Sequence, residues 1–227
     1  MISRDQVILV HGLWMNGSEF ATLKRHLKRE HGFDVHVFSY PTLYGHAGEI
    51  CAELADFATR VADGGRVHFV GHSLGGTFVY RVLNEYPGRF RGNAVLLGSP
   101  LSGCRAARGV LRWPMLRPVL GPHLLGEVTA PVERCWRGPG ALGTIAGTRR
   151  LGAGQFFAHF DEPNDGTVAA SETIIPGLDD HLELPRSHMG MLFARDVAAQ
   201  VAHFLRNAKF RRNERSHVES ALGIAGN

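Results

Sequence analysis

The chain has 227 residues, of which 44% are hydrophobic and 20% charged, and its formal net charge is +4. This length suits one α/β domain, and the ordinary composition argues against a disordered chain. So small a net charge excludes a uniformly basic nucleic-acid-binding protein.

Short apolar runs alternate with longer amphipathic stretches along the chain. Strands are predicted at residues 7–10, 35–38, 67–70 and 94–97, near 142–146 and near 182–184. Helices are predicted between them, at residues 18–29, 48–62, 74–85 and 190–206. This alternation predicts a mostly parallel sheet of about six strands with helices on both faces.

The alternation breaks after the fourth predicted strand. Residues 101–140 contain five prolines, which interrupt long helices, and mix apolar residues with arginines. We interpret this stretch as a short lid inserted into a single domain at 1–206. Residues 207–227 are polar and are expected to form a flexible tail.

Other features of the sequence limit the class of protein that it can encode. No run reaches the roughly 18 apolar residues of a membrane span, and the first residues lack a signal-peptide pattern. The three cysteines are too few for a disulfide framework or a zinc site, although a single Cys104–Cys135 bridge stays open. We therefore expect a cytoplasmic protein without stable membrane insertion and without a bound metal.

One sequence motif predicts a catalytic residue. Residues 71–75 read GHSLG, which matches G-x-S-x-G between a predicted strand and a predicted helix. In that context the serine stands on a strained turn with its hydroxyl above the sheet edge, and Ser73 becomes a candidate nucleophile. The alternative, an incidental serine in a glycine-rich turn, is disfavoured by this context. The glycines lack the Gly-Lys-Ser/Thr of a phosphate-binding loop, so nucleotide binding is disfavoured.

A serine nucleophile needs a general base, expected after a late strand. His188 follows the predicted strand at 182–184 and precedes the last helix, so it is the preferred base. His181 precedes that strand and would lie at the wrong edge of the sheet. His203 falls inside the last helix, which favours a surface role.

The acid that orients the base is expected between the nucleophile and His188 in the chain. Asp165 lies in an Asn-Asp-Gly turn after the strand near 142–146 and is the preferred candidate. Asp161 in the same loop is its rival, and a plain Asp-Gly turn remains an alternative reading. Asp179 and Asp180 resemble an acidic turn before a strand.

An oxyanion hole needs two backbone N–H groups near the nucleophile. Leu74 follows Ser73 and supplies one of them by position. The loop after the first strand supplies the other from Leu13, since Gly12 allows a close approach. His11 is expected to brace this loop and not to catalyse.

Together these motifs resemble a known set. Residues 10–13, 71–76, 164–168 and 187–190 look like the motifs of α/β-hydrolase lipases and esterases. The chain is similar to small bacterial lipases and to PGAP-type inositol-deacylase-like hydrolases, which carry a stretch like residues 98–103. The resemblance implies a minimal α/β-hydrolase fold and hydrolysis of acyl esters through an acyl-enzyme. It also implies a triad of Ser73, Asp165 and His188.

The resemblance implies no cofactor and a small-molecule ester as the partner, with no nucleic acid. Trp14, Met15 and Tyr44 are expected near the mouth of the site, where they contact a small or medium hydrophobic acyl group or only pack the insertion. An amidase, thioesterase or lysophospholipase could use the same triad, and a non-catalytic binding protein on this fold is the alternative from another class. The oligomeric state is left open.

Charge is segregated in the second half of the chain. Residues 101–150 hold eight basic and two acidic residues, whereas residues 151–205 hold two basic and eight acidic ones. We hypothesise that these blocks attract each other across the mouth of the site, or that the basic block meets an anionic surface. Nucleic-acid or membrane binding by the basic block is the weaker alternative.

Overall fold

The protein is built on one six-stranded sheet, and the computed structural model describes residues 5–44, 46–116, 121 and 134–212. All neighbouring strands are parallel, in the order β2-β1-β3-β4-β5-β6. The strands are β1 (Gln6–Val10), β2 (Asp34–Phe38), β3 (Val67–His72), β4 (Ala94–Leu97), β5 (Leu142–Gly147) and β6 (Asp180–Leu184). The predicted α/β class is confirmed.

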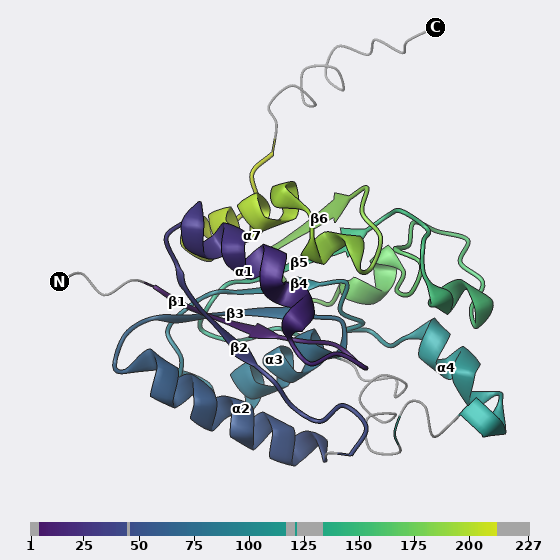
Figure 1. Ribbon diagram of the computed structural model, residues 1–227, viewed down its shortest axis with the longest axis horizontal. Coiled ribbons are helices and arrows are strands. Elements are labelled where there is room, and N and C mark those ends of the chain that lie inside the picture. The colour runs from purple at the N-terminus through teal and green to yellow at the C-terminus, as the bar shows by residue number, and fades with distance from the viewer. Residues whose placement is uncertain (1–4, 45, 117–120, 122–133, 213–227) are drawn as a thin grey trace, which may run out of the picture.

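Helices cover both faces of the sheet (Figure 1). One face carries α1 (Ala21–Arg29) and α7 (Arg195–Asn207), and the other carries α2 (Ala47–Ala62) and α3 (Leu74–Glu85). A shorter helix, α4 (Arg105–Leu111), lies at one end of the sheet. None of the helices in the described part of the chain combines the length and apolarity needed to cross a bilayer.

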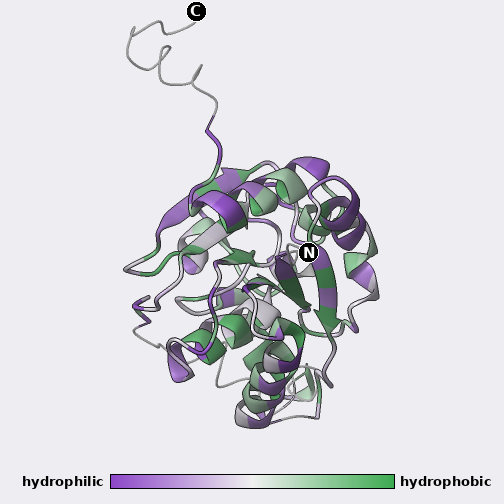
Figure 2. Cartoon of the chain, turned by 90° about the vertical axis from the view of Figure 1, so that its left-hand side faces the viewer, coloured by the Kyte–Doolittle hydropathy of each residue, from purple (hydrophilic) through white to green (hydrophobic). Residues whose placement is uncertain are grey.

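The alternation of side chains along each strand divides the core into two layers. Ile8 and Val10 pack with α2 and α3, whereas Val7 and Leu9 pack with α1 and α7. Successive side chains of a strand point to opposite faces, so a strand buried on both faces is a continuous apolar run. Figure 2 shows the sheet largely green between helices whose outer faces are purple. The sheet is therefore a rigid support for the loops at its edges.

The strand order places a crevice at one edge of the sheet. The chain leaves β1 towards β2 on one side, and β3 then pairs with the other side of β1. In open parallel sheets the loops that follow two such strands run towards opposite faces of the sheet, and a crevice forms between them at the carboxyl ends of the strands. The loops after β1 and β3, which carry Leu13 and Ser73, border this crevice.

Several boundaries differ from the predicted ones. The last helix begins at Arg195, because residues 190–192 form a separate 3-10 turn. Strand β6 begins at Asp180, so His181 lies within the strand and does not precede it. In the predicted insertion at 101–140, α4 is followed by a 3-10 turn at Pro114–Leu116. Residues 117–120 and 122–133 of the insertion lie outside the described residues.

One residue near the start of the predicted tail, Phe210, is packed onto the domain. The Phe210 side chain is only 4% exposed, and its ring centroid lies 4.7 Å from that of Phe204 in α7. Its backbone N–H donates to the Asp180 carboxylate at 2.8 Å. The polar composition of the segment concealed this one apolar anchor. Residues 213–227 lie outside the described residues.

If Phe210 anchors the end of the domain, Phe210→Ala should lower the free energy of unfolding by about 3 kcal/mol, because it removes a buried aromatic ring. The matched control is Phe156→Ala, which truncates an exposed phenylalanine and should change stability by less than about 0.5 kcal/mol. Urea denaturation followed by circular dichroism measures both. Equal effects of the two substitutions would contradict the packing described here.

Candidate active site

Ser73 occupies a strained turn between β3 and α3. Its φ is 53° and its ψ is −125°, a conformation that L-residues rarely adopt. The Ser73 N–H donates to the Leu97 carbonyl at 2.9 Å, and the Gly76 N–H donates to the Ser73 carbonyl at 3.0 Å. A Cβ on Gly75 would lie 2.2 Å from the Val10 carbonyl oxygen, so only glycine fits there. This geometry has the strained form expected of a nucleophile elbow.

His188 and Asp165 form a buried pair on the loops that follow β6 and β5. His188 Nδ1 lies 2.6 Å from Asp165 Oδ2, and the Asp165 side chain is almost fully buried. The other carboxylate oxygen, Oδ1, accepts hydrogen bonds from the backbone N–H groups of Thr167 at 2.9 Å and Val168 at 2.7 Å. The carboxylate therefore has a fixed orientation, and it can hold a proton on Nδ1 and leave Nε2 free to accept one.

The rival acids have other partners. Asp161 is exposed and pairs with His159 at 2.8 Å, and Asp179 accepts the Leu142 N–H at 2.8 Å. Asp180 accepts the Phe210 N–H. The structure thus brings Asp165, among these four, to His188.

The rival bases are also placed elsewhere. His181 is hydrogen-bonded to the Thr144 hydroxyl at 2.7 Å within the sheet. The His203 backbone carbonyl accepts a hydrogen bond from the Asn207 side chain one turn further along α7. Neither histidine lines the cavity that contains Ser73 and His188.

The loop after β1 is braced by a buried histidine. The ring of His11 stacks on Tyr40 with centroids 4.3 Å apart, and the Tyr40 N–H donates to His11 Nε2 at 3.2 Å. His11 Nδ1 is then the protonated nitrogen, and it donates to the Gly12 carbonyl at 3.0 Å. Burial lowers the pKa of His11, so the ring stays neutral. His11 has the bracing position expected of it.

Two backbone amides are candidates for the oxyanion hole. Leu74 is the first residue of α3, and the first N–H groups of a helix have no acceptor within the helix. Leu13 and Leu74 both line the cavity beside Ser73. The positive end of the α3 dipole adds to the stabilisation of negative charge at this point.

Ser73 and His188 open into a mostly apolar cavity of about 300 Å³. One wall is α4, whose Ala106, Ala107 and Val110 face the cavity. The loop after β5 also lines the cavity, with Leu151, Phe157 and Val168. Volume and lining suit a small or medium apolar group.

The expected mouth residues divide into two groups. Trp14 and Met15 line the cavity, and Trp14 is an exposed aromatic residue with a positive φ of 60°. Tyr44 does not line the cavity, and 87% of its side chain is exposed. Its place after β2 puts it at the same edge of the sheet, but sequence could not show that it lies away from the cavity.

Cys104 also lines the cavity, and its environment opposes a nucleophilic role. Burial raises the pKa of the Cys104 thiol to about 12, so it is protonated at neutral pH. Its sulfur instead accepts a hydrogen bond from the Ala107 N–H at the start of α4. Cys104 and Cys135 are both free thiols, so no Cys104–Cys135 bridge forms in this structure.

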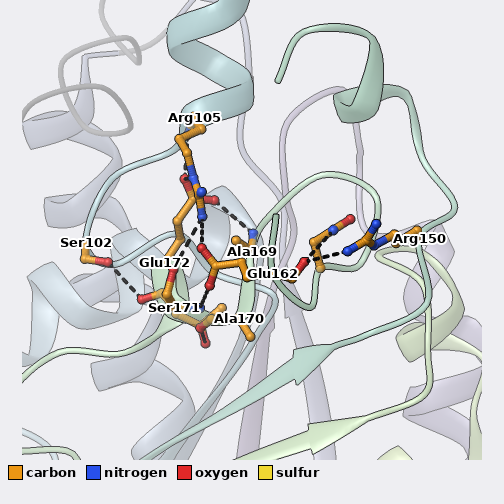
Figure 3. A network of polar contacts seen from close by, with 10 residues as sticks. Ser102, Arg105, Arg150, Glu162, Ala169, Ala170, Ser171 and Glu172 are labelled. Atoms are coloured by element: carbon orange, nitrogen blue, oxygen red, sulfur yellow. Dashed lines mark hydrogen bonds and ion pairs between the residues drawn. The ribbon is translucent and has the colours of Figure 1, made fainter. Parts of the chain in front are cut away.

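The basic and acidic blocks meet at Arg105 (Figure 3). Arg105 Nε lies 3.1 Å from Glu172, and the Arg105 backbone N–H donates to the same carboxylate at 2.6 Å. A second ion pair joins Arg105 to Glu162. The other oxygen of Glu172 accepts the Ala169 N–H at 2.9 Å. This network ties α4 to the loop that carries Asp165.

Two supporting residues were not found from the sequence. His72 is fully buried beside His188, with ring centroids 4.7 Å apart, and its Nε2 donates to the His188 carbonyl at 3.1 Å. Burial holds the pKa of His72 well below its usual value, so it adds no positive charge next to the base. Gly98 has a φ of 52°, and a Cβ there would lie 2.8 Å from Asp165 Oδ2. The sequence carries no local signal for either contact.

Potential metal ligands do not cluster around the site. Among the residues that the structure describes, no group of three or more histidine, cysteine, aspartate or glutamate side chains is arranged to hold a metal ion.

A curated relative matches part of the chain. A pimeloyl-acyl-carrier-protein methyl ester esterase of Shewanella woodyi is 28% identical over 116 residues. That alignment covers 50% of this chain and 43% of the esterase, so the chain matches less than half of that protein's length.

Solved structures share the fold. A metagenomic carboxyl esterase is 20% identical with a TM-score of 0.66, covering 83% of this chain and 65% of that chain. The mature form of a Bacillus licheniformis lipase is 18% identical with a TM-score of 0.65, covering 85% of this chain and 88% of that chain. A sequence profile of the alpha/beta hydrolase family matches residues 7–215. The chain therefore belongs to the alpha/beta hydrolase family.

Proposed function

We propose that the protein is a serine hydrolase of carboxylic esters that acts through an acyl-enzyme. The observation that carries this proposal is the buried His188–Asp165 pair, whose histidine lines the same apolar cavity as Ser73 on its strained turn. An alpha/beta hydrolase with these three groups at one sheet edge has the nucleophile, base and orienting acid that acyl transfer requires.

The proposed reaction begins at Ser73. His188 Nε2 takes the hydroxyl proton as the Ser73 oxygen attacks the ester carbonyl, and Asp165 stabilises the imidazolium through Nδ1. The N–H groups of Leu13 and Leu74 bind the oxyanion of the tetrahedral intermediate. His188 then protonates the leaving alcohol, which gives the acyl-enzyme. In the second half, His188 removes a proton from water as the water oxygen attacks the acyl carbonyl. The second tetrahedral intermediate then breaks its bond to the Ser73 oxygen, which takes the proton back from His188 as the carboxylic acid leaves.

The cavity suggests the kind of ester. Its walls of alanine, valine, leucine and phenylalanine offer an apolar surface, and about 300 Å³ suits a small or medium acyl group better than a long one. Trp14 and Met15 lie at the nucleophile and contact the substrate in this proposal.

The curated relative supports an ester as the substrate. The partial match in Shewanella woodyi is a methyl ester esterase, and two of the structural neighbours are a carboxyl esterase and a lipase. A triad of this kind also serves amides, thioesters and lysophospholipids, so a panel of substrates matched in acyl group compares these reactions directly.

Ser73→Ala should lower the turnover of p-nitrophenyl butyrate at least about 1,000-fold, because no other group in the cavity replaces the attacking oxygen. Ser18→Ala alters an exposed serine on another loop and should keep the parent rate. Labelling by a fluorophosphonate probe should be lost in the first variant and kept in the second. Near-parent turnover by Ser73→Ala would refute the proposed nucleophile, and an unlabelled parent would favour a non-catalytic binding protein.

Asp165→Asn should lower kcat about 1,000- to 10,000-fold at neutral pH. The N–H groups of Thr167 and Val168 both donate to Oδ1, so the asparagine must place its oxygen there and turn its NH₂ towards His188. His188 Nδ1 then accepts a hydrogen bond, its proton moves to Nε2, and Nε2 can no longer take the Ser73 proton. Asp161→Asn is the matched control in the same loop, and an equal loss in that variant would contradict the assignment.

Ala107→Phe should shift the preference towards short acyl groups, because the new ring fills part of the cavity beside α4. We expect the ratio of kcat/KM for p-nitrophenyl octanoate to that for the acetate to fall at least about tenfold, since each lost methylene contact is worth about 0.8 kcal/mol. Ala52→Phe, on the exposed side of α2, should leave the ratio unchanged. An unchanged ratio in Ala107→Phe would place the acyl group elsewhere.

A further inference from the structure

Exposed apolar side chains gather at one edge of the molecule. Nine large apolar side chains are exposed in the described part of the chain. Three of them, Trp14, Leu151 and Met189, line the cavity that contains Ser73. Trp113 and Met115 follow directly after α4, which lines the same cavity, and Phe156 ends a 3-10 turn that contacts α4.

Six of these side chains form what we call the apolar rim. They are Trp14 after β1, Trp113 and Met115 after β4, Leu151 and Phe156 after β5, and Met189 after β6. Met115 is 92% exposed and Phe156 is 85% exposed, so neither packs against the domain to any extent. Clusters of exposed apolar side chains in soluble domains mark surfaces that contact another phase or molecule.

Positive charge accompanies the rim. Arg108 and Arg112 are exposed at α4, directly before Trp113. Both line a cleft of about 310 Å³ together with Phe157, and Phe157 also lines the cavity that contains Ser73. The inner side of α4 thus faces the cavity, and its outer side presents arginines next to exposed tryptophan and methionine.

This combination matches one kind of surface. Tryptophan, methionine and phenylalanine beside arginine favour the boundary between headgroups and acyl chains of a bilayer, where apolar rings are buried and guanidinium groups meet phosphates. A second copy of the chain fits less well, since a two-fold contact through the rim would bring the same arginines of both copies together. The positive charge of Arg108 and Arg112 and the exposed apolar side chains therefore favour an anionic lipid surface.

We propose that the apolar rim binds reversibly to the surface of an anionic phospholipid bilayer, with Trp113, Met115 and Phe156 at the headgroup level and Arg108 and Arg112 on the phosphates. In this orientation the mouth beside Ser73 faces the lipid. Lipid binding does not depend on hydrolysis. The proposed hydrolysis can therefore be refuted while lipid binding holds, and lipid binding can be refuted while hydrolysis holds.

Binding is measured with the full-length Ser73→Ala variant, which keeps the surface and removes the proposed hydrolysis. The protein is sedimented with phosphatidylcholine vesicles that contain about 30 mol% phosphatidylglycerol, and with vesicles of phosphatidylcholine alone. We expect partitioning at least about tenfold stronger on the anionic vesicles, and most of that difference lost at roughly 0.5 M salt. Equal partitioning on both vesicles, or none on either, would overturn the proposal.

Matched variants locate the contact. Met115→Ser should weaken partitioning about tenfold, and Ile174→Ser, an exposed apolar residue outside the rim, should not. Arg108→Gln with Arg112→Gln should weaken binding to anionic vesicles about tenfold or more, whereas Arg25→Gln with Arg60→Gln makes the same charge change on α1 and α2 and should have little effect.

Circular dichroism confirms that each variant is folded. Equal losses in rim variants and controls would refute a contact through the rim. A protein that sediments as a dimer without lipid, and as a monomer after Met115→Ser, would show that a second copy occupies the rim instead.

Discussion

The backbone of Ser73 is the constraint on which the rest of the site depends. A positive φ at a non-glycine residue costs about 1–3 kcal/mol and persists only where its surroundings hold it. Here β3 is buried along its whole length, and the Ser73 N–H and carbonyl are both hydrogen-bonded. The packing of the sheet thus supports a turn that local preferences alone would not form. In return, the turn lifts one hydroxyl above the sheet edge, beside the first N–H groups of α3.

Every other part of the site is brought to this hydroxyl by the parallel order of the strands. Leu13 follows β1, Asp165 follows β5 and His188 follows β6, and the carboxyl ends of parallel strands meet at one edge. The Asp165 carboxylate is buried but not isolated, because two backbone N–H groups and one imidazole satisfy its oxygens. Burial of a charge is tolerated under these conditions, and the fixed carboxylate orients the ring.

Sequence could predict the parts of this arrangement that are local. The apolar runs gave the strands, and the G-x-S-x-G motif between strand and helix placed Ser73 on the turn. The order of motifs along the chain sufficed to choose His188 and Asp165 over their neighbours. One basic residue of the first block, Arg105, pairs with Glu172 of the second, and the attraction hypothesised across the mouth of the site stays a prediction.

What sequence could not predict depends on contacts between residues far apart in the chain. His72 and His188 are separated by 116 positions, and nothing in the sequence near either residue indicates that the His72 ring donates a hydrogen bond to the His188 carbonyl. The packing of Phe210 could not be predicted because the residues around it are polar. One buried ring fixes this segment to the domain although its neighbours are exposed charges. Tyr44 was expected near the mouth of the site but does not line the cavity, because its position depends on the path of the loop after β2.

The two faces of α4 connect the cavity with the molecular surface. A seven-residue helix has too little of its own stability to stand alone, so it depends on contacts made at its first turn. Arg105 supplies them through Glu172 and Glu162, which belong to the same loop as Asp165. The wall of the cavity and the carboxylate that pairs with His188 therefore share these contacts, and in the proposed reaction a movement of α4 would disturb both substrate fit and proton transfer. A lipid surface bound to the outer side of α4, as we propose, would contact a helix that is tied to the loop of the proposed acid.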